Sequence, residues 1–166
     1  VKKDLKKSKI KVNYIIDKSR NTTVKERFWA NKYKLLQVNS VDNHIPNKDI
    51  LNKISNKIQN VNTDLIIFSD FRHGVFNDIS IKLYCKNIKK NVIKVADSQV
   101  SNRWGNILDF KKFDLLLPNE KEARFSLGDQ DGSVRTLGTK LISQSKSKNV
   151  ILKLGDKGIM SFKKKG

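Results

Sequence analysis

Short apolar runs alternate with stretches of helical periodicity along most of the chain. Four runs rich in Ile, Val, Leu or Phe end in polar or turn-forming residues, at 64–70, 91–97, 113–119 and 149–155. Apolar residues around them recur at three- and four-residue spacing, which predicts helices over 48–60, over 78–90, from 119 onward, and over 133–147. This alternation is typical of a mostly parallel sheet with helices on both faces, so the sequence predicts an α/β fold.

The first quarter of the chain departs from this alternation. We expect the end of a helix over 1–9, a short strand over 11–16, and two extended runs over 22–30 and 33–41. Asn31-Lys32 joins the last two runs and suits the tight turn of a hairpin. At the other end of the chain, 158–162 should pair with the preceding strand through a turn that contains Gly155 and Gly158.

The length and composition indicate one domain. No repeat and no Ser/Gly-rich linker divides the 166 residues. The chain begins with Val and stops just after an apolar run, so we interpret it as part of a longer protein. No apolar stretch approaches the roughly 20 residues that span a bilayer, and a single cysteine, Cys85, fits a reducing compartment. These features predict a cytoplasmic protein without a membrane partner.

The net charge is +19, from 35 Lys and Arg against 16 Asp and Glu. A nucleic-acid-binding module is therefore an alternative, and the mixture of aromatic and basic residues in "RFWANKYK" agrees with it. However, most basic residues are Lys scattered among Asn and Ile, a pattern that A+T-rich codons produce without selection for a basic surface. We therefore do not expect nucleic acid as the partner, although a positive field would attract a phosphorylated substrate.

Three of the predicted strands end in polar side chains, in the sequences "FSD", "VAD" and "LPN". Ligands of open α/β sheets bind outside the carboxyl ends of the strands. Asp70, Asp97 and Asn119 should therefore lie along one edge of the sheet. This position alone predicts no role for Asp97 or for Gln99 close to it.

Asn119 and Glu122 permit two interpretations. In a capping box, Asn119 would accept a hydrogen bond from the first helical turn and Glu122 would accept one from the N–H of Asn119. In a ligand site, both would face the sheet edge and organise water around Mg²⁺ beside a nucleotide's phosphates, because Mg²⁺ keeps several waters and needs few carboxylates. The spacing alone leaves both interpretations open.

Four segments resemble the ribokinase-like, or PfkB-type, carbohydrate kinases, in the order that the family has them. "LLLPNEKEA" is similar to the N-x-x-E segment, and "NVILKLGDKGIM" to the late strand-turn-strand whose glycines approach the ATP phosphates. "SRNTTVKERFWA…YKLLQVN" and "DLIIFSDFRHGVF" resemble segments of the bacterial heptose-phosphate kinase branch. The resemblance implies a three-layer sandwich, ATP and Mg²⁺ as cofactors, and phosphoryl transfer to a hydroxyl of a sugar or sugar phosphate.

The resemblance also implies roles for individual residues, with Glu122 reaching Mg²⁺ through water. The catalytic and nucleotide-side residues would be Asn119, Glu122, Lys153, Gly155 and Gly158. The sugar-side residues would be Thr23, Lys25, Arg27 and Asp70. His73 stands where the heptose-phosphate branch has Lys, which leaves the identity of the sugar open.

Two segments of the family have no counterpart in the 166 residues. The early Gly-rich sugar-binding segment is absent, and so is the late Gly-Ala-Gly-Asp segment that supplies the catalytic base and an anion hole. The resemblance therefore implies a partial carbohydrate kinase domain over 1–166, incomplete at both ends and inactive by itself. A homodimer is one assembly that we consider, and a non-catalytic remnant that keeps the fold for association is a further alternative.

Overall fold

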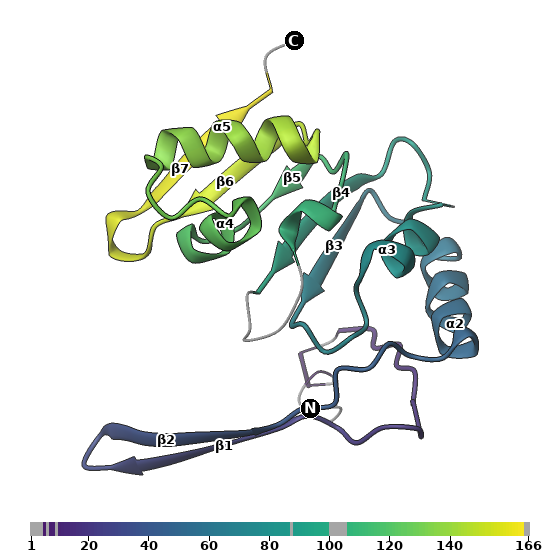
Figure 1. The fold of residues 1–166 in the computed structure, drawn as a ribbon. Helices are drawn as coiled ribbons and strands as arrows, with labels where there is room; N and C mark the ends of the chain where they lie inside the picture. Colours follow the sequence, from purple (N-terminus) through teal and green to yellow (C-terminus); the bar gives the residue numbers. More distant parts are fainter. Residues whose placement is uncertain (1–4, 6, 9, 87, 100–105, 165–166) are drawn as a thin grey trace.

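The structure, a computed structural model, describes residues 5, 7, 8, 10–86, 88–99 and 106–164. Its main sheet has the strand order β3 (Leu65–Asp70), β4 (Ile93–Ser98), β5 (Leu115–Leu116), β6 (Asn149–Lys153) and β7 (Ile159–Lys163). Neighbouring strands from β3 to β6 are parallel, and β7 returns antiparallel to β6. Figure 1 shows this sheet with its helices, so the predicted α/β class and mostly parallel sheet are confirmed.

Each helix from α2 to α5 begins at a polar residue whose side chain accepts a hydrogen bond from the first turn. The helices are α2 (Lys48–Gln59) after Asn47, α3 (Asp78–Cys85) after Asn77, α4 (Glu120–Leu127) after Asn119, and α5 (Val134–Ser145) after Ser133. α3 ends at Cys85 rather than at residue 90, and Ile88 packs against the core from the turn that follows. None of the described helices is long and apolar enough to cross a membrane.

One continuous core lies between the sheet and the helices. Phe68, Ala96, Leu116 and Val150 are neighbours across β3 to β6 and are almost fully buried. The helices contribute side chains to the same cluster, namely Leu51, Ile81, Tyr84, Ala123, Leu137 and Leu141. Burial of apolar surface stabilises the fold by roughly 25 cal/mol per Å². The core thereby holds the carboxyl ends of the parallel strands at one edge of the sheet.

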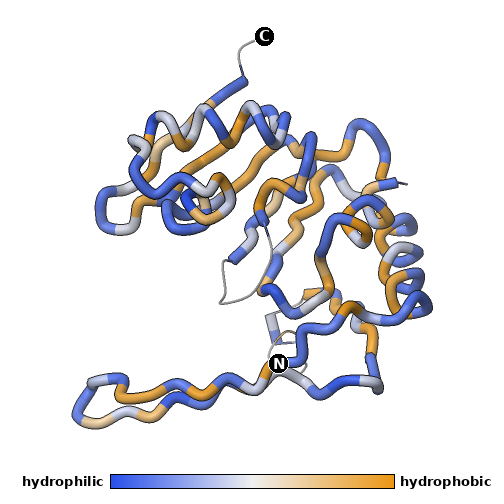
Figure 2. The backbone as a smooth tube through the Cα atoms, viewed as in Figure 1, coloured by the Kyte–Doolittle hydropathy of each residue, from blue (hydrophilic) through white to orange (hydrophobic). Residues whose placement is uncertain are grey.

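The opposite face of the sheet is partly exposed, although Val95 on this face is buried. Side chains alternate between the two faces of a strand, and four aliphatic residues of the second face are between 41% and 68% exposed: Leu65, Ile67, Ile93 and Ile159. Figure 2 shows that the strands of the main sheet are largely hydrophobic, as a sheet covered on both faces would be. Within the described residues, however, the helices that join the core lie on one face only.

A separate hairpin forms from β1 (Val24–Ala30) and β2 (Tyr33–Ser40), as predicted. Asn31 and Lys32 form its turn with φ angles of 45° and 73°, the left-handed values that a two-residue turn between strands needs. Figure 1 shows the hairpin extending away from the body on the side where β3 to β6 end. Its two faces differ, because the pairing places polar Lys25 and Arg27 opposite Asn39 and Gln37, and apolar Phe28 opposite Leu36.

Two expectations for the remaining segments need correction. The strand predicted over 11–16 is wrong, because these residues are irregular and no strand in the described part of the chain pairs with them. β5 is shorter than the apolar run 113–119, since Pro118 has no N–H to donate and only the isolated bridge of Asn119 with Lys153 follows it. The helix end predicted over 1–9 lies mainly outside the described residues.

Replacing Gly138 by Ala is expected to destabilise the protein by about 1–3 kcal/mol. In an exposed helix the same change would stabilise by about 1 kcal/mol, but a Cβ at residue 138 of α5 would overlap the ring of Phe162 on β7. Urea unfolding measures the difference. Thr139→Ala, at an exposed position of the same helix, is the control and should change stability little. A Gly138→Ala protein as stable as the unmodified chain would show that the Phe162 ring moves aside freely.

Candidate functional site

The carboxyl edge of the sheet brings together the predicted nucleotide-side residues. Lys153 ends β6, and its Nζ lies 2.9 Å from Oδ1 of Asp97 near the end of β4. Asn119 follows β5 and forms a parallel bridge with Lys153. Asp97, Asn119 and Lys153 are therefore neighbours at this edge, and the Lys153 ammonium has a carboxylate partner.

Asn119 and Glu122 form a capping box at the start of α4. The side-chain oxygen of Asn119 accepts a hydrogen bond from the N–H of Glu122 at 2.9 Å, and Oε2 of Glu122 accepts one from the N–H of Asn119 at 2.7 Å. Glu122 is 4% exposed and lies at the positive end of the helix dipole. The capping interpretation is confirmed, and a role toward Mg²⁺ stays a prediction that requires an intervening water.

Gly155 and Gly158 shape the turn between β6 and β7. Their φ angles are 66° and 85°, and a Cβ at either position would have no described atom within 4 Å. A positive φ angle is unfavourable for residues with a Cβ, which explains why both positions are occupied by glycine.

A pocket of about 550 Å³ opens at the base of the hairpin. Its lining residues come from the start of β1 and the segment before it, from the segment after β2 and from the loop after β3. They are Arg20, Asn21, Thr22, Thr23, Lys25, Asp42, His73 and Val75. Nη1 of Arg20 donates to the carbonyl oxygen of His73 at 2.8 Å and to that of His44 at 3.2 Å. Oγ1 of Thr23 lies 3.4 Å from Nδ1 of His73. Two predicted sugar-side residues, Thr23 and Lys25, thus share one pocket with His73.

The interior of this pocket favours an anion. Burial and the charge of Lys25 lower the pKa of His73 below its ordinary value of 6.5, with Arg20 acting in the same direction and Asp70 against it. The lowered pKa favours the neutral imidazole at pH 7. Lys25, two threonine hydroxyls and the imidazole suit the charge-assisted hydrogen bonds of a phosphate group. Arg20 adds a second cation, although its Nε already lies 3.1 Å from Oδ2 of Asp17, and Asp42 adds one carboxylate to the lining.

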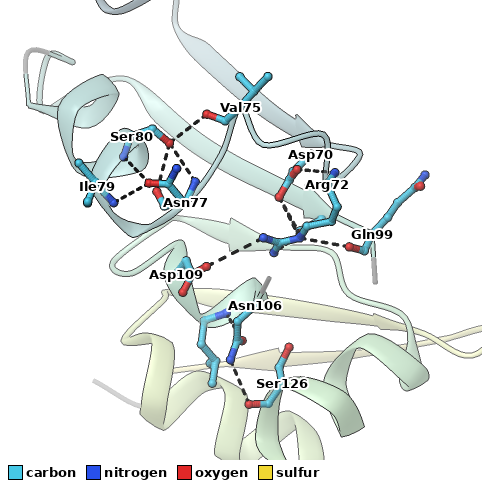
Figure 3. A network of polar contacts seen from close by, with 12 residues as sticks. Asp70, Arg72, Val75, Asn77, Ile79, Ser80, Gln99, Asn106, Asp109 and Ser126 are labelled. Atoms are coloured by element: carbon cyan, nitrogen blue, oxygen red, sulfur yellow. Dashed lines mark hydrogen bonds and ion pairs between the residues drawn. The ribbon is translucent and has the colours of Figure 1, made fainter. Parts of the chain in front are cut away.

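The other two predicted sugar-side residues are not among those that line this pocket. Arg27 lies further along β1, where its Nε donates to Oε1 of Gln37 at 3.0 Å. Asp70 is 2% exposed, and Figure 3 shows its carboxylate paired with Arg72. Burial raises the pKa of Asp70, and the charge of Arg72 opposes this effect. Contacts of Arg27 or Asp70 with a sugar stay predictions.

Sequence reasoning missed Arg20 and Arg72. Arg20 directly precedes "NTT", and a cation beside two hydroxyl residues was the signal that could have indicated an anion pocket. Arg72 has a φ angle of 59°, and a left-handed conformation at an arginine is too uncommon to be predicted from sequence. Its position therefore became visible only in the structure.

The fold is that of the ribokinase-like sugar kinases. The structure matches ribokinase from Giardia lamblia with a TM-score of 0.76 at 16% identity, over 98% of this chain and 54% of that one. It matches phosphofructokinase-2 from Escherichia coli, solved with fructose-6-phosphate, with a TM-score of 0.59 at 16% identity, over 79% of this chain and 45% of that one. The tetrameric inhibited form of the same enzyme matches with a TM-score of 0.57 at 16% identity, over 79% and 45%.

This likeness shows the fold, and the chain spans about half the length of these structural neighbours. No family model and no curated protein sequence matches the chain.

Proposed function

We propose that the chain is the central part of a carbohydrate kinase domain that transfers a phosphoryl group from ATP to a hydroxyl of a sugar or sugar phosphate. The carrying observation is the pocket around His73, where Lys25 and Arg20 supply cations beside one carboxylate, that of Asp42, on the side of the fold where the parallel strands end. A fold alone does not define a function, but this pocket offers matching chemistry. Arg20 and Lys25 would neutralise a substrate phosphate, and the hydroxyls of Thr22 and Thr23 would donate to it.

The nucleotide would bind along the other part of the same edge. Lys153 would exchange its Asp97 partner for a phosphate oxygen, and the Gly155 turn would pass close to the nucleotide. Glu122 would hold Mg²⁺ through water, since Mg²⁺ commonly takes one or two carboxylates beside substrate phosphates. The described residues contain no cluster of three His, Cys, Asp or Glu side chains that could bind a metal alone, which agrees with such a site. Mg²⁺ would neutralise charge on the transferring group.

We propose further that the domain is incomplete within the 166 residues. Phosphoryl transfer to an alcohol needs a group that accepts the hydroxyl proton, and the Gly-Ala-Gly-Asp segment that carries this base in the resembled family is absent. The exposed Ile67 and Ile93 support the same proposal, because additional helices would bury them in a sheet covered on both faces. The exposed face also favours the second candidate, a non-catalytic remnant that uses the fold for association.

A homodimer is part of the proposal. The apolar face of the hairpin carries Val24, Phe28, Leu36 and Val38, which are between 45% and 55% exposed. An isolated two-stranded hairpin is at best marginally stable in water, so contact with a second copy would stabilise it. The polar face with Lys25 would remain directed to the pocket.

The 166-residue chain alone is expected to release no ADP above background when it is supplied with MgATP and sugar phosphates. Loss of a general base lowers a rate by roughly 10²- to 10⁴-fold, and the complete domain should recover the activity. A coupled ADP-release assay on both proteins measures this. Robust turnover by the 166-residue chain would show that the base lies within it. A complete domain that phosphorylates neither sugars nor sugar phosphates would refute the kinase proposal.

A further inference from the structure

Arg72 is a buried residue that connects the sheet edge to the pocket. It is 5% exposed, and Figure 3 shows its guanidinium reaching several groups from different segments. Nε lies 3.1 Å from Oδ2 of Asp70 and donates to the carbonyl oxygen of Gln99 at 3.2 Å. Nη2 donates to Oγ of Ser98 at 2.6 Å, and Nη1 lies 4.0 Å from Oδ2 of Asp109 in η1 (Ile107–Asp109). Arg72 therefore ties the end of β3 to the end of β4 and to η1.

The backbone of Arg72 is fixed by the same carboxylate. Oδ1 of Asp70 accepts a hydrogen bond from the Arg72 N–H at 2.7 Å, and the left-handed φ of 59° turns the chain sharply after β3. The next residue is His73, whose carbonyl and ring lie at the pocket. The conformation at Arg72 thus sets the direction in which the pocket-lining loop 71–75 leaves β3.

The remainder of the loop is held from its other side. Gly74 has a φ of 79°, and a Cβ there would collide with the backbone of residues 43 and 44, so the loop packs tightly against the segment after β2. Oγ of Ser80 donates to the carbonyl oxygen of Val75 at 2.9 Å. Because the end of the loop is anchored in α3, the position of His73 also depends on the beginning of the loop, which Arg72 holds.

We propose that Arg72 is a positioning residue for the anion pocket, and that it acts through His73 rather than by touching the substrate. Its contacts hold the His73 carbonyl where Arg20 donates to it and the His73 ring beside Thr23. This inference rests on the proposed function, since it assumes that the pocket receives the phosphate of a sugar phosphate. Binding of the phosphate in the pocket would then depend on Arg72, although Arg72 does not line the pocket.

The test compares Arg72→Lys with Arg124→Lys in the 166-residue chain. Arg124 is the matched control, because it also pairs with a carboxylate, that of Glu120 at 2.7 Å, and donates to backbone carbonyls far from the pocket. The chain has two histidines, so NMR can follow the ring signals of His73 directly once they are distinguished from those of His44. Fructose 6-phosphate and inorganic phosphate are the binding probes.

Arg72→Lys should weaken binding of fructose 6-phosphate about tenfold, since small displacements of a positioned group have large effects on a site. The His73 pKa should move back toward its ordinary value as the ring leaves its partly buried position. Arg124→Lys should alter neither quantity. A folded Arg72→Lys protein with unchanged affinity and an unchanged His73 pKa would overturn the proposal.

Ser98→Ala keeps the inference testable if Arg72→Lys does not fold. It removes the 2.6 Å hydrogen bond that Nη2 of Arg72 donates to Ser98 and the 3.2 Å hydrogen bond that Ser98 donates to Oδ2 of Asp70, and it leaves the ion pair between Arg72 and Asp70 in place. A weakening of about threefold with a smaller change at His73 would support positioning by Arg72, whereas unchanged values would overturn it. If the unmodified chain binds neither fructose 6-phosphate nor inorganic phosphate, the sugar-phosphate function of the pocket fails. The His73 pKa comparison still decides whether Arg72 positions the loop.

Discussion

Exchanging Glu122 for Gln is expected to lower the phosphoryl-transfer rate of the complete kinase domain by about 10- to 100-fold, the usual effect of losing an outer-shell group of a metal site. Gln keeps an oxygen that can accept the hydrogen bond from the N–H of Asn119, which is 2.7 Å long, so the capping box should survive. The substitution removes the negative charge and replaces the other carboxylate oxygen by an NH₂ group. Measuring kcat over a range of Mg²⁺ concentrations, together with the melting temperature, separates the two roles.

Two further variants make this experiment decisive. Glu120→Gln is the matched control, because Glu120 lies in the same first turn of α4 and pairs with Arg124 rather than with Asn119. It should leave the rate and the Mg²⁺ dependence unchanged. Glu122→Ala removes both charge and cap, and should also lower stability by about 1 kcal/mol. If Glu122→Gln left the Mg²⁺ dependence of the rate untouched, the carboxylate would serve the capping box alone.

Features set by neighbouring residues could be predicted from the sequence. The capping box of Asn119 and Glu122 and the turn at Asn31 and Lys32 each depend on side chains within four positions, and both are present. The strand predicted over 11–16 failed because a strand also needs a partner from elsewhere in the chain, and apolar residues alone do not supply one. Features that depend on nearby residues could therefore be predicted from the sequence, whereas the pairing of strands could not.

The candidate site shows the same limit. Thr23 and His73 meet in the pocket although 50 positions separate them, and the sequence gives no measure of such a contact. The resemblance implied a sugar-side role for Asp70, and the sequence did not reveal that the left-handed turn at Arg72 folds a guanidinium back onto its carboxylate. The sequence placed these acids at the carboxyl ends of the strands, where the structure has them, and could not show which of them have internal partners.

Replacing Lys25 by Gln is expected to weaken the binding of a sugar phosphate about tenfold, equivalent to about 1.4 kcal/mol. Lys25 lines the pocket from the polar face of β1, and its charge acts on His73. Hydrogen bonds to charged groups contribute about 1.5–3 kcal/mol, and solvent screening reduces this value because Lys25 is exposed. Calorimetric titration with fructose 6-phosphate and with fructose measures the effect, and only the phosphorylated sugar should bind more weakly.

Lys34→Gln separates the pocket from the overall charge of the protein. Lys34 is an exposed residue of β2, and its replacement removes one charge from the same hairpin without altering the pocket lining. Fructose 6-phosphate should bind this variant almost unchanged, and an equal loss in both variants would indicate general attraction of anions by the net charge of +19. An equal loss for fructose and its phosphate in Lys25→Gln would instead assign Lys25 to the sugar hydroxyls. The His73 pKa offers an independent check, because removing the Lys25 charge removes one of the causes that lower it, so it should rise in Lys25→Gln alone.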